Sequence, residues 1–495
     1  MKKRNLHSDV CIIGAGIMSA SYAMLLHELE PDIKIYIFER LEAPALESTG
    51  VLNNAGTGHA AYCELNYTPI KIDGSINIDK ATLVTKQFEQ SKSYWAHLVE
   101  KYKLIRPEDF IHRVPHISFV WGDENVSFLR KRFEAMQSNP FFEAMVFSDN
   151  ASELKEWMPL VMQDRTTKLS CAATYMKEGT DVNFESLTNA IFKYLNSKYV
   201  VKIFLKHELR DINRNVSNEW DLCICDLNSE EEFVITTPLV FVGAGGGALD
   251  ILDKSGIDEA DGYGGFPISG QWLRCTNQAV INQHNVKVYG KAELGSPPMS
   301  VPHLDTRFIF GKKELLFGPF AGLTTKFLKE GSKLDLAASL DWDNILSMLS
   351  AGWHNLDLTK YLLEQSQLTH EERIMILRDY YPNANGLDWE LCIAGQRVQI
   401  IKKDEDQGGI LEFGTEIVAS KDGSITAVLG ASPGASVSVS IILEILERSM
   451  PYKYHTDEWQ TKLKNIIPFM EKIIEPEMES IHSTKYKNNK ILGLN

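Results

Sequence analysis

The sequence lacks several features that would point to particular classes of protein. Its seven cysteines include no C-x-x-C pair, so we expect a reducing compartment and no metal site, although Cys223 and Cys225 would share one face of a strand. Positive charge is scarce: 51 basic residues stand against 66 acidic ones, for a net charge of −15. This balance argues against a nucleic-acid binder, which must neutralise phosphates.

Long apolar runs are also missing. No apolar stretch or small-residue cleavage site precedes the first expected strand, so no signal peptide is predicted and a cytoplasmic protein fits best. Only segment 425–446 approaches the length of a membrane span, and a proline and two glycines interrupt it, which favours strand, turn and helix instead. With 495 residues, 44% of them hydrophobic, the chain is long enough for about three domain-sized units.

The N-terminus has the pattern of a dinucleotide-binding βαβ unit. An apolar strand from Val10 runs into a turn at Gly14 and Gly16, followed by an amphipathic helix and a second strand that ends at Glu39. Gly14 permits the tight turn, Gly16 lets the backbone approach a pyrophosphate, and Glu39 can accept hydrogen bonds from ribose hydroxyls. Ser19 replaces the third glycine and is small enough for close helix packing.

Two further glycine turns follow apolar strands. The first turn contains Gly245 and is predicted to belong to the far half of the same dinucleotide domain. The alternative is a glycine turn that packs against its neighbours and contacts no ligand. The second, Gly430–Gly434, matches the G-x-S-x-G motif of serine hydrolases at Ser432. Pro433 follows that serine and has no N–H for an oxyanion hole, so hydrolysis is a remote alternative. Beside a flavin, Gly430, Ser432 and Gly434 would place a helix dipole near the charge of the reduced ring.

These patterns predict an α/β fold, α+β overall, with a discontinuous Rossmann-like domain and an inserted, mainly antiparallel-sheet substrate domain. The dinucleotide-binding domain is expected in three segments, 1–104, 179–267 and 386–450. The substrate domain is expected in two, 105–178 and 268–385. A polar tail, 451–495, completes the chain.

Longer motifs resemble those of a known family. The segments LNNAGTGHA from Leu52, CELNYTP, GKAELGSPPMSVPHLDTR, AGQRVQIIKKD and LGASPGAS are similar to those of the malate:quinone oxidoreductases, and the resemblance runs from about residue 8 to 450. It implies FAD rather than NAD as the cofactor, oxidation of (S)-malate to oxaloacetate, and a membrane quinone as electron acceptor. The residues alone indicate only a flavin or nicotinamide oxidoreductase. Lactate or another 2-hydroxy acid as substrate, and a flavoprotein without turnover, remain alternatives.

Oxidation of a 2-hydroxy acid by a flavin needs a base for the hydroxyl proton and cations for the carboxylates. Arg397 is the predicted carboxylate ligand, because D-amino-acid-oxidase-like enzymes place an arginine on a comparable element and its planar fork suits a carboxylate. Arg307 is predicted to hold the second carboxylate, unless it pairs with Asp305. Gln271 and Arg274 are further candidates for the substrate pocket, or decorate a strand.

Two histidines are candidates for the base. His303 is the leading one, since an imidazole pKa near 6.5 suits proton abstraction at neutral pH. His59 is the rival, and the turn before it, formed by Gly56, Thr57 and Gly58, is predicted to approach the flavin through its backbone N–H groups.

A membrane quinone requires a membrane surface, so the resemblance implies peripheral contact with the cytoplasmic face of the cell membrane. The local feature available is a cluster of lysines at the C-terminus, Lys485, Lys487 and Lys490. Each contributes about 1 kcal/mol near an anionic surface, and the alternative is a solvated tail. The oligomeric state stays open.

Overall fold

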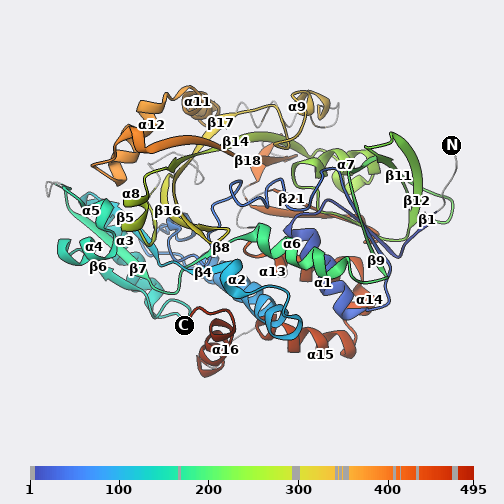
Figure 1. Ribbon diagram of the computed structural model, residues 1–495, viewed down its shortest axis with the longest axis horizontal. Helices are drawn as coiled ribbons and strands as arrows, with labels where there is room; N and C mark the ends of the chain where they lie inside the picture. The colour runs from blue at the N-terminus through green and yellow to red at the C-terminus, as the bar shows by residue number, and fades with distance from the viewer. Residues whose placement is uncertain are drawn as a thin grey trace.

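The protein consists of a Rossmann-like part and a large antiparallel sheet (Figure 1). Residues of both parts line one cavity. The computed structural model describes residues 6–165, 169–291, 301–340, 344, 348, 350, 356–404, 408–412, 414–430, 434–470 and 478–495.

The Rossmann-like part is built on a six-stranded sheet whose strands come from distant parts of the chain. In spatial order the strands are β20 (Thr415–Ala419), β21 (Ile425–Gly430), β13 (Val240–Val242), β2 (Val10–Ile13), β3 (Ile35–Glu39) and β9 (Val201–Leu205). All neighbours are parallel except β20 and β21. Parallel strands of this kind are buried on both faces of the sheet, so their sequences are continuous apolar runs.

Strand alternation assigns the two faces of this sheet. Val10 and Ile12 pack with three helices of one face, whereas Cys11 and Ile13 pack with α7 (Ala248–Ser255) on the other. The three helices are α1 (Ile17–Leu29), α6 (Phe184–Leu195) and α13 (Ser438–Ser449), which lie together in Figure 1. A smaller sheet lies beside α7 and contains β1 (Leu6–His7), β12 (Glu231–Thr237), β11 (Trp220–Asp226) and β10 (His207–Arg214).

The second part is a nine-stranded sheet that is antiparallel except where β15 meets β5. In order its strands are β19 (Ile410–Glu412), β18 (Trp389–Lys402), β14 (Gly264–Cys275), β17 (Lys312–Leu323), β16 (His303–Ile309), β15 (Lys287–Tyr289), β5 (His116–Trp121), β7 (Cys171–Met176) and β6 (Val146–Ser148). Short helices cover it, namely α3 (Asp123–Gln137), α4 (Ala151–Trp157), α5 (Pro159–Met162), α8 (Gln278–Gln283), α9 (Asp335–Ala338), α11 (Leu356–Gln367) and α12 (His370–Tyr380). A two-stranded pair joins β4 (Ile111–Arg113) to β8 (Thr180–Val182).

The predicted fold class is confirmed, but one boundary differs. Strands β18 and β19 lie in segment 386–450, which was expected in the dinucleotide domain, yet they extend the large sheet because β18 pairs along β14 from Trp389 to Ile401. The chain therefore enters the Rossmann-like sheet again only at β20.

The C-terminal segment is folded rather than solvated. The helices α14 (Pro451–Tyr454), α15 (Asp457–Ile466) and α16 (Met478–Ile491) follow α13, and both α15 and α16 contact α2 (Asp79–His97). Ile481 and Leu492 are buried, which anchors the segment. Segment 425–446 forms β21 and α13, as predicted. In the part of the chain that the structure describes, no helix has both the length and the apolar character needed to cross a bilayer.

Candidate active site

A cavity of about 970 Å³ lies between the two sheets, at the upper end of the usual range of about 300–1,000 Å³ for ligand sites. The three predicted glycine turns line it, and so do β14 and β18 of the large sheet. Ligands of open α/β sheets bind beyond the carboxyl ends of the strands, which is where these turns lie. The cavity is therefore the candidate active site.

The first turn has the geometry that the sequence predicts. Gly14 has φ +94°, and a Cβ there would lie 2.6 Å from the carbonyl oxygen of Gly243, so only glycine fits. Gly16 is the N-cap of α1 and has no side chain to cap the helix. Ser19 does not line the cavity; its hydroxyl lies against Gly243 and packs α1 on the β13 turn. The Glu39 carboxylate lines the cavity and accepts hydrogen bonds from the N–H groups of Ala15 and Leu41, at 2.8 and 2.9 Å.

The other two turns reach the same cavity. Gly245 has φ +56° and faces open space, because a Cβ there would meet only the Ser48 hydroxyl at 3.9 Å. Gly430 has φ +91° and lies against the carbonyl of Gly414. Gly434 lines the cavity, whereas Ser432 lies outside the described residues.

The lining also carries buried polar atoms that no described residue satisfies. Gln396 Oε1 and Trp272 Nε1 are both buried without a hydrogen-bond partner among the residues that the structure places. A buried polar atom without a partner costs about 1–3 kcal/mol. A ligand that carries phosphates and further polar groups fits this lining, because the glycine turns offer backbone N–H groups and Trp272 and Gln396 offer a donor and an acceptor.

Arg397 contributes a cation to the cavity. It lies on β18 opposite Ile268 of β14, and its side chain lines the cavity. Burial lowers the pKa of its guanidinium, and the nearby Tyr67 opposes this effect. Within the described residues no ion pair or hydrogen bond of this guanidinium is found, so its fork is open to a carboxylate.

His303 forms a dyad with Asp305. Its Nδ1 lies 2.7 Å from Asp305 Oδ2, and its ring is stacked on Tyr289, with ring centroids 4.0 Å apart and an interplanar angle of 7°. Trp272 contacts the same ring edge-on. Burial alone would raise the pKa of Asp305, but His303 and Lys287 lower it to about 2. The carboxylate therefore stays ionised and fixes the imidazole at the cavity wall.

Behind this dyad lies a fully buried cluster of charges. Lys287 Nζ is 3.0 Å from Asp181 Oδ1 and 3.5 Å from Asp305 Oδ2, and it donates a hydrogen bond to the Ala55 carbonyl. Arg307 Nε lies 2.7 Å from Asp181 Oδ1. Two cations thus balance two anions, which is the condition under which buried charges are tolerated.

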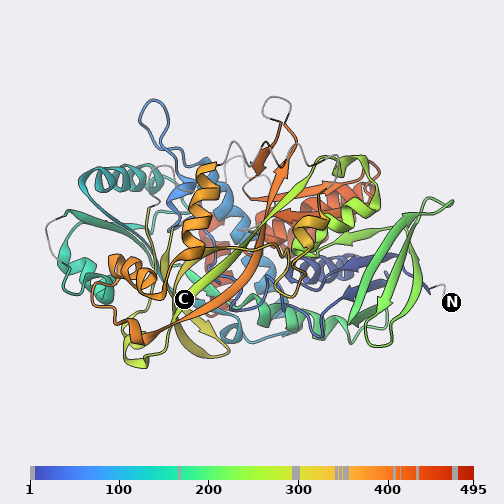
Figure 2. The ribbon, with the colours of Figure 1, turned by 90° about the horizontal axis from the view of Figure 1, so that it is seen from above.

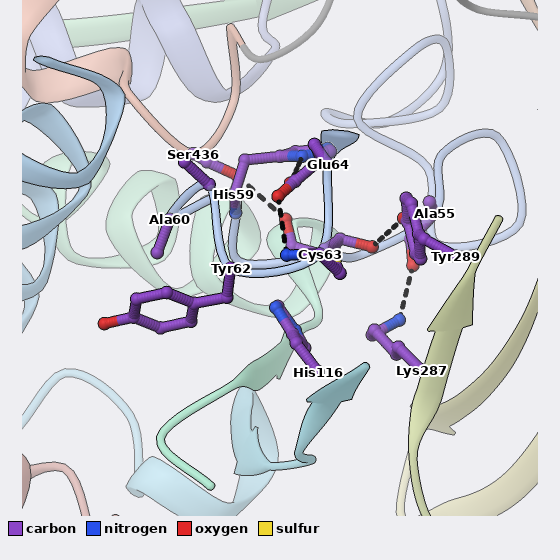
Figure 3. Close-up of polar contacts among 12 residues, drawn as sticks. Ala55, His59, Ala60, Tyr62, Cys63, Glu64, His116, Lys287, Tyr289 and Ser436 are labelled. Atoms are coloured by element: carbon purple, nitrogen blue, oxygen red, sulfur yellow. Dashed lines mark hydrogen bonds and ion pairs between the residues drawn. The ribbon is translucent and has the colours of Figure 1, made fainter. Parts of the chain in front are cut away.

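His59 forms a second dyad on the same cavity. Its Nδ1 is bound to Glu64 Oε1, and its backbone N–H donates to the hydroxyl of Ser436 at 3.2 Å. Figure 3 shows this group on one side and Lys287 pointing toward Ala55 on the other. Burial by itself would raise the pKa of Glu64, but His59 lowers it to about 2.

The turn before His59 is held from behind. Thr57 lines the cavity, and its hydroxyl hydrogen-bonds that of Tyr289 at 2.8 Å. Gly56 has φ +58° and lies on the Arg307 guanidinium, where a Cβ would approach to 2.2 Å. Gly58 packs against Thr180 and Phe88, away from the lining.

Three predicted substrate ligands are not brought to the cavity. Arg307 is fully buried in its pair with Asp181 and also donates to the Asn54 carbonyl at 2.6 Å. Arg274 is bound to Glu314 and Glu390 outside the cavity. Gln271 accepts a hydrogen bond from Arg373 at 2.9 Å, and it is the neighbouring Trp272 that lines the cavity.

Comparison with known proteins decides the family. Residues 6–494 match the family model described as malate:quinone oxidoreductase. A probable malate:quinone oxidoreductase from Flavobacterium johnsoniae is 51% identical over 99% of this chain and 98% of its own length. A second, from Pseudomonas aeruginosa, is 50% identical over 98% of this chain and 96% of its own length.

This chain belongs to the malate:quinone oxidoreductase family. The resemblance noted in the motifs is therefore confirmed, and FAD is the cofactor of this group of oxidoreductases. The glycine turns and Glu39 are the residues that would hold it. Neither the hydrolase alternative at Gly430–Gly434 nor the nicotinamide alternative is favoured by this membership.

Solved structures place the malate:quinone oxidoreductase chain in a wider fold group. A dithionite-reduced L-α-glycerophosphate oxidase from Mycoplasma pneumoniae with FAD bound has a TM-score of 0.57 at 14% identity, over 90% of this chain and 94% of its own. A glycine oxidase from Geobacillus kaustophilus has the same TM-score at 14% identity, over 90% and 95% of the two chains. At these identities the likeness concerns the fold alone.

Several residues of the site were missed in the sequence. Asp305 was considered only as a partner of Arg307, yet it pairs with His303. The available signal was strand alternation, because His303, Asp305 and Arg307 are two residues apart and share one face of β16. Lys287, Tyr289 and Glu64 carried no comparable local signal.

Proposed function

We propose that this chain oxidises (S)-malate to oxaloacetate in the cavity between the two sheets and delivers the two electrons to a membrane quinone. One observation carries the proposal: the Arg397 guanidinium, which pairs with no anion among the described residues, lines the same cavity as the His303–Asp305 dyad in a member of this family. The two groups supply what a 2-hydroxy acid requires, a carboxylate ligand and a base.

Arg397 binds one carboxylate of malate. Its side chain is half-buried on a strand, so little conformational freedom is lost on binding, and no described anion competes for it. A bidentate pair of charge-assisted hydrogen bonds fixes the plane of the carboxylate and therefore the position of C2.

His303 accepts the proton of the malate hydroxyl. Since Nδ1 faces Asp305 Oδ2 at 2.7 Å, Nε2 is the nitrogen left to take a proton from substrate. The carboxylate of Asp305 then stabilises the imidazolium, as the orienting carboxylate of a catalytic triad does. When bound, FAD supplies the acceptor for the hydride that leaves C2, and loss of this hydride together with the hydroxyl proton converts malate into oxaloacetate.

His59 is proposed to serve the second carboxylate of malate. The ionised carboxylate of Glu64 holds Nδ1 of the imidazole, and the side chain faces the cavity that holds Arg397. Arg307, which the sequence suggested for this role, is unsuitable because its guanidinium is paired with Asp181. Lactate has no second carboxylate, so replacing His59 by Gln should raise KM for malate more than for lactate.

A direct experiment follows the colour of the flavin. The holoenzyme is mixed anaerobically with malate and, in parallel, with lactate, and is then reoxidised with a soluble short-chain quinone. We expect bleaching by malate and recovery of absorbance with the quinone. Bleaching by lactate alone, or turnover that requires NAD, would overturn the proposal. Delivery to a membrane quinone further implies peripheral contact with the cytoplasmic face of the membrane.

A further inference from the structure

A short hairpin projects beside α3 and the large sheet, and in the chain it lies between residues that line the cavity and α2. It spans Pro69–Asn77, and Figure 2 shows the chain at this point as a blue loop standing clear of the body. The Lys71 N–H donates to the Ser75 carbonyl at 2.8 Å, and the Asn77 N–H donates to the Pro69 carbonyl at 2.9 Å. The hairpin is thus a hydrogen-bonded structure with a defined tip.

The exposed part of this hairpin carries two isoleucines among polar residues. Ile72 is fully exposed, at 110% of its reference area, and Ile70 is 57% exposed, whereas Ile76 is buried in a small core with Leu65 and Phe128. One buried isoleucine therefore anchors the hairpin while two others face outward. Single exposed apolar residues are common on protein surfaces, so exposure alone assigns no role to them.

The position of the hairpin gives the exposed residues a role. Pro69 and Ile70 also line the active-site cavity, together with Phe128, Tyr361 and Leu362. An apolar surface thus continues from the exposed tip to the wall of the cavity. A quinone dissolved in a bilayer needs such a path, because its tail cannot cross water at low cost.

Only part of the C-terminal lysine cluster remains available for a membrane surface. Lys485 is buried and bonded to Glu178 at 2.8 Å, whereas Lys487 and Lys490 are exposed. The whole chain carries a net charge of −15, which opposes approach to an anionic surface. At the hairpin the charges of Lys71 and Asp73 cancel, so the contact that this segment can offer a membrane is insertion of its apolar side chains.

We propose that the hairpin Pro69–Asn77 inserts Ile72 and Ile70 into the lipid bilayer and thereby places the mouth of the cavity against the membrane that carries the quinone. This inference rests on the proposed function, because it takes the quinone to be the electron acceptor. The partner of the hairpin is a lipid surface rather than a second copy of the chain.

The experiment compares two hairpin tips in the FAD-loaded enzyme. Ile72→Asp changes the tip proposed to insert, and Val216→Asp is the matched control, since Val216 is 107% exposed at the turn between β10 and β11. Binding to vesicles of phosphatidylcholine with one quarter phosphatidylglycerol is measured by co-sedimentation, at low and high salt. Activity with a soluble short-chain quinone is measured in parallel.

We expect Ile72→Asp to weaken vesicle binding at least ten-fold, Val216→Asp to leave it unchanged, and salt to have little effect on the wild type. Activity with the soluble quinone should be equal in all three proteins. The inference is overturned if the wild type does not bind vesicles, if both variants lose binding equally, or if Ile72→Asp changes only the oligomeric state. Malate oxidation with the soluble quinone would survive each of these results, so failure of the docking surface is distinct from failure of the proposed function.

Discussion

Replacing Asp305 by Asn tests the assignment of the base. The side chain keeps its shape, but the amide can donate a hydrogen to His303 Nδ1, 2.7 Å away in the wild type. The imidazole is then held with its proton on Nε2, the nitrogen that has to accept the malate hydroxyl proton. The same change in a catalytic triad traps the wrong tautomer.

The expected effect is large on the rate and moderate on the fold. A lost general base and its orienting carboxylate reduce kcat by about 10²–10⁴-fold, or roughly 3–5 kcal/mol of activation free energy. KM for malate should change little, because Arg397 is untouched. Lys287 keeps Asp181 at 3.0 Å, so we expect a loss of only about 1–3 kcal/mol in the free energy of unfolding.

The assay is the rate of flavin reduction by malate in a stopped-flow instrument, with flavin content measured for each protein. Glu64→Gln is the matched control, since it makes the same change in the His59 dyad. We expect this control to raise KM for malate and to leave the limiting rate within a few-fold of wild type. A limiting rate that survives Asp305→Asn and collapses in Glu64→Gln would refute the reasoning and make His59 the base.

Three further outcomes are expected. Arg397→Gln should lower kcat/KM for malate by about 10²-fold in steady-state assays, because roughly 3 kcal/mol of charge-assisted hydrogen bonding is lost. Arg397→Lys should recover part of the lost kcat/KM. An unchanged KM in Arg397→Gln would contradict the role of Arg397. Gly14→Ala should abolish FAD retention during gel filtration, because its Cβ meets the Gly243 carbonyl at 2.6 Å. The control is Gly256→Ala, at a glycine with φ +62° that lies outside the cavity lining and has nothing within 4 Å of an added Cβ; it should cost only about 1 kcal/mol and keep the flavin. Equal behaviour of the two variants would contradict the turn geometry. The pKa of Asp305 is lowered to about 2 in the folded protein, so the stability that its ionised form contributes is complete above the unfolded pKa near 4 and is lost as the pH falls toward 2. In urea unfolding, the free energy of unfolding should fall by roughly 1 kcal/mol between pH 6 and pH 3 through this group. Asp305→Asn should remove this pH dependence.

The sequence was sufficient for features that depend on local pattern. The turn at Gly14 and Gly16, the strand that ends at Glu39 and the placement of Gly245 and Gly430 on one cavity all follow from an apolar strand entering a glycine turn. These positions depend on backbone conformation, which near neighbours in the chain dictate.

The sequence was insufficient where a side chain takes its partner from a distant strand. Arg307 is drawn from the substrate by Asp181, 126 positions earlier, and Arg274 is held by Glu314. Lys485 lies against Glu178 for the same reason. A cation that looks available in the sequence is free only if no distant anion reaches it, and that depends on the tertiary fold.

The order of strands in the six-stranded sheet has a consequence for synthesis of the protein. The central strand β2 pairs on one side with β3, which is the next strand in the sequence. On its other side β2 pairs with β13, and the far edge of β13 pairs with β21. Between Val10 and Ile425 the ribosome adds about 415 residues, which takes roughly 20–80 s at about 5–20 residues per second. For that time the cavity lacks its third glycine turn, although the second, after β13, is already made. The cofactor site is therefore incomplete, and the edge of β13 that receives β21 stays unpaired, until nearly all of the chain has been made.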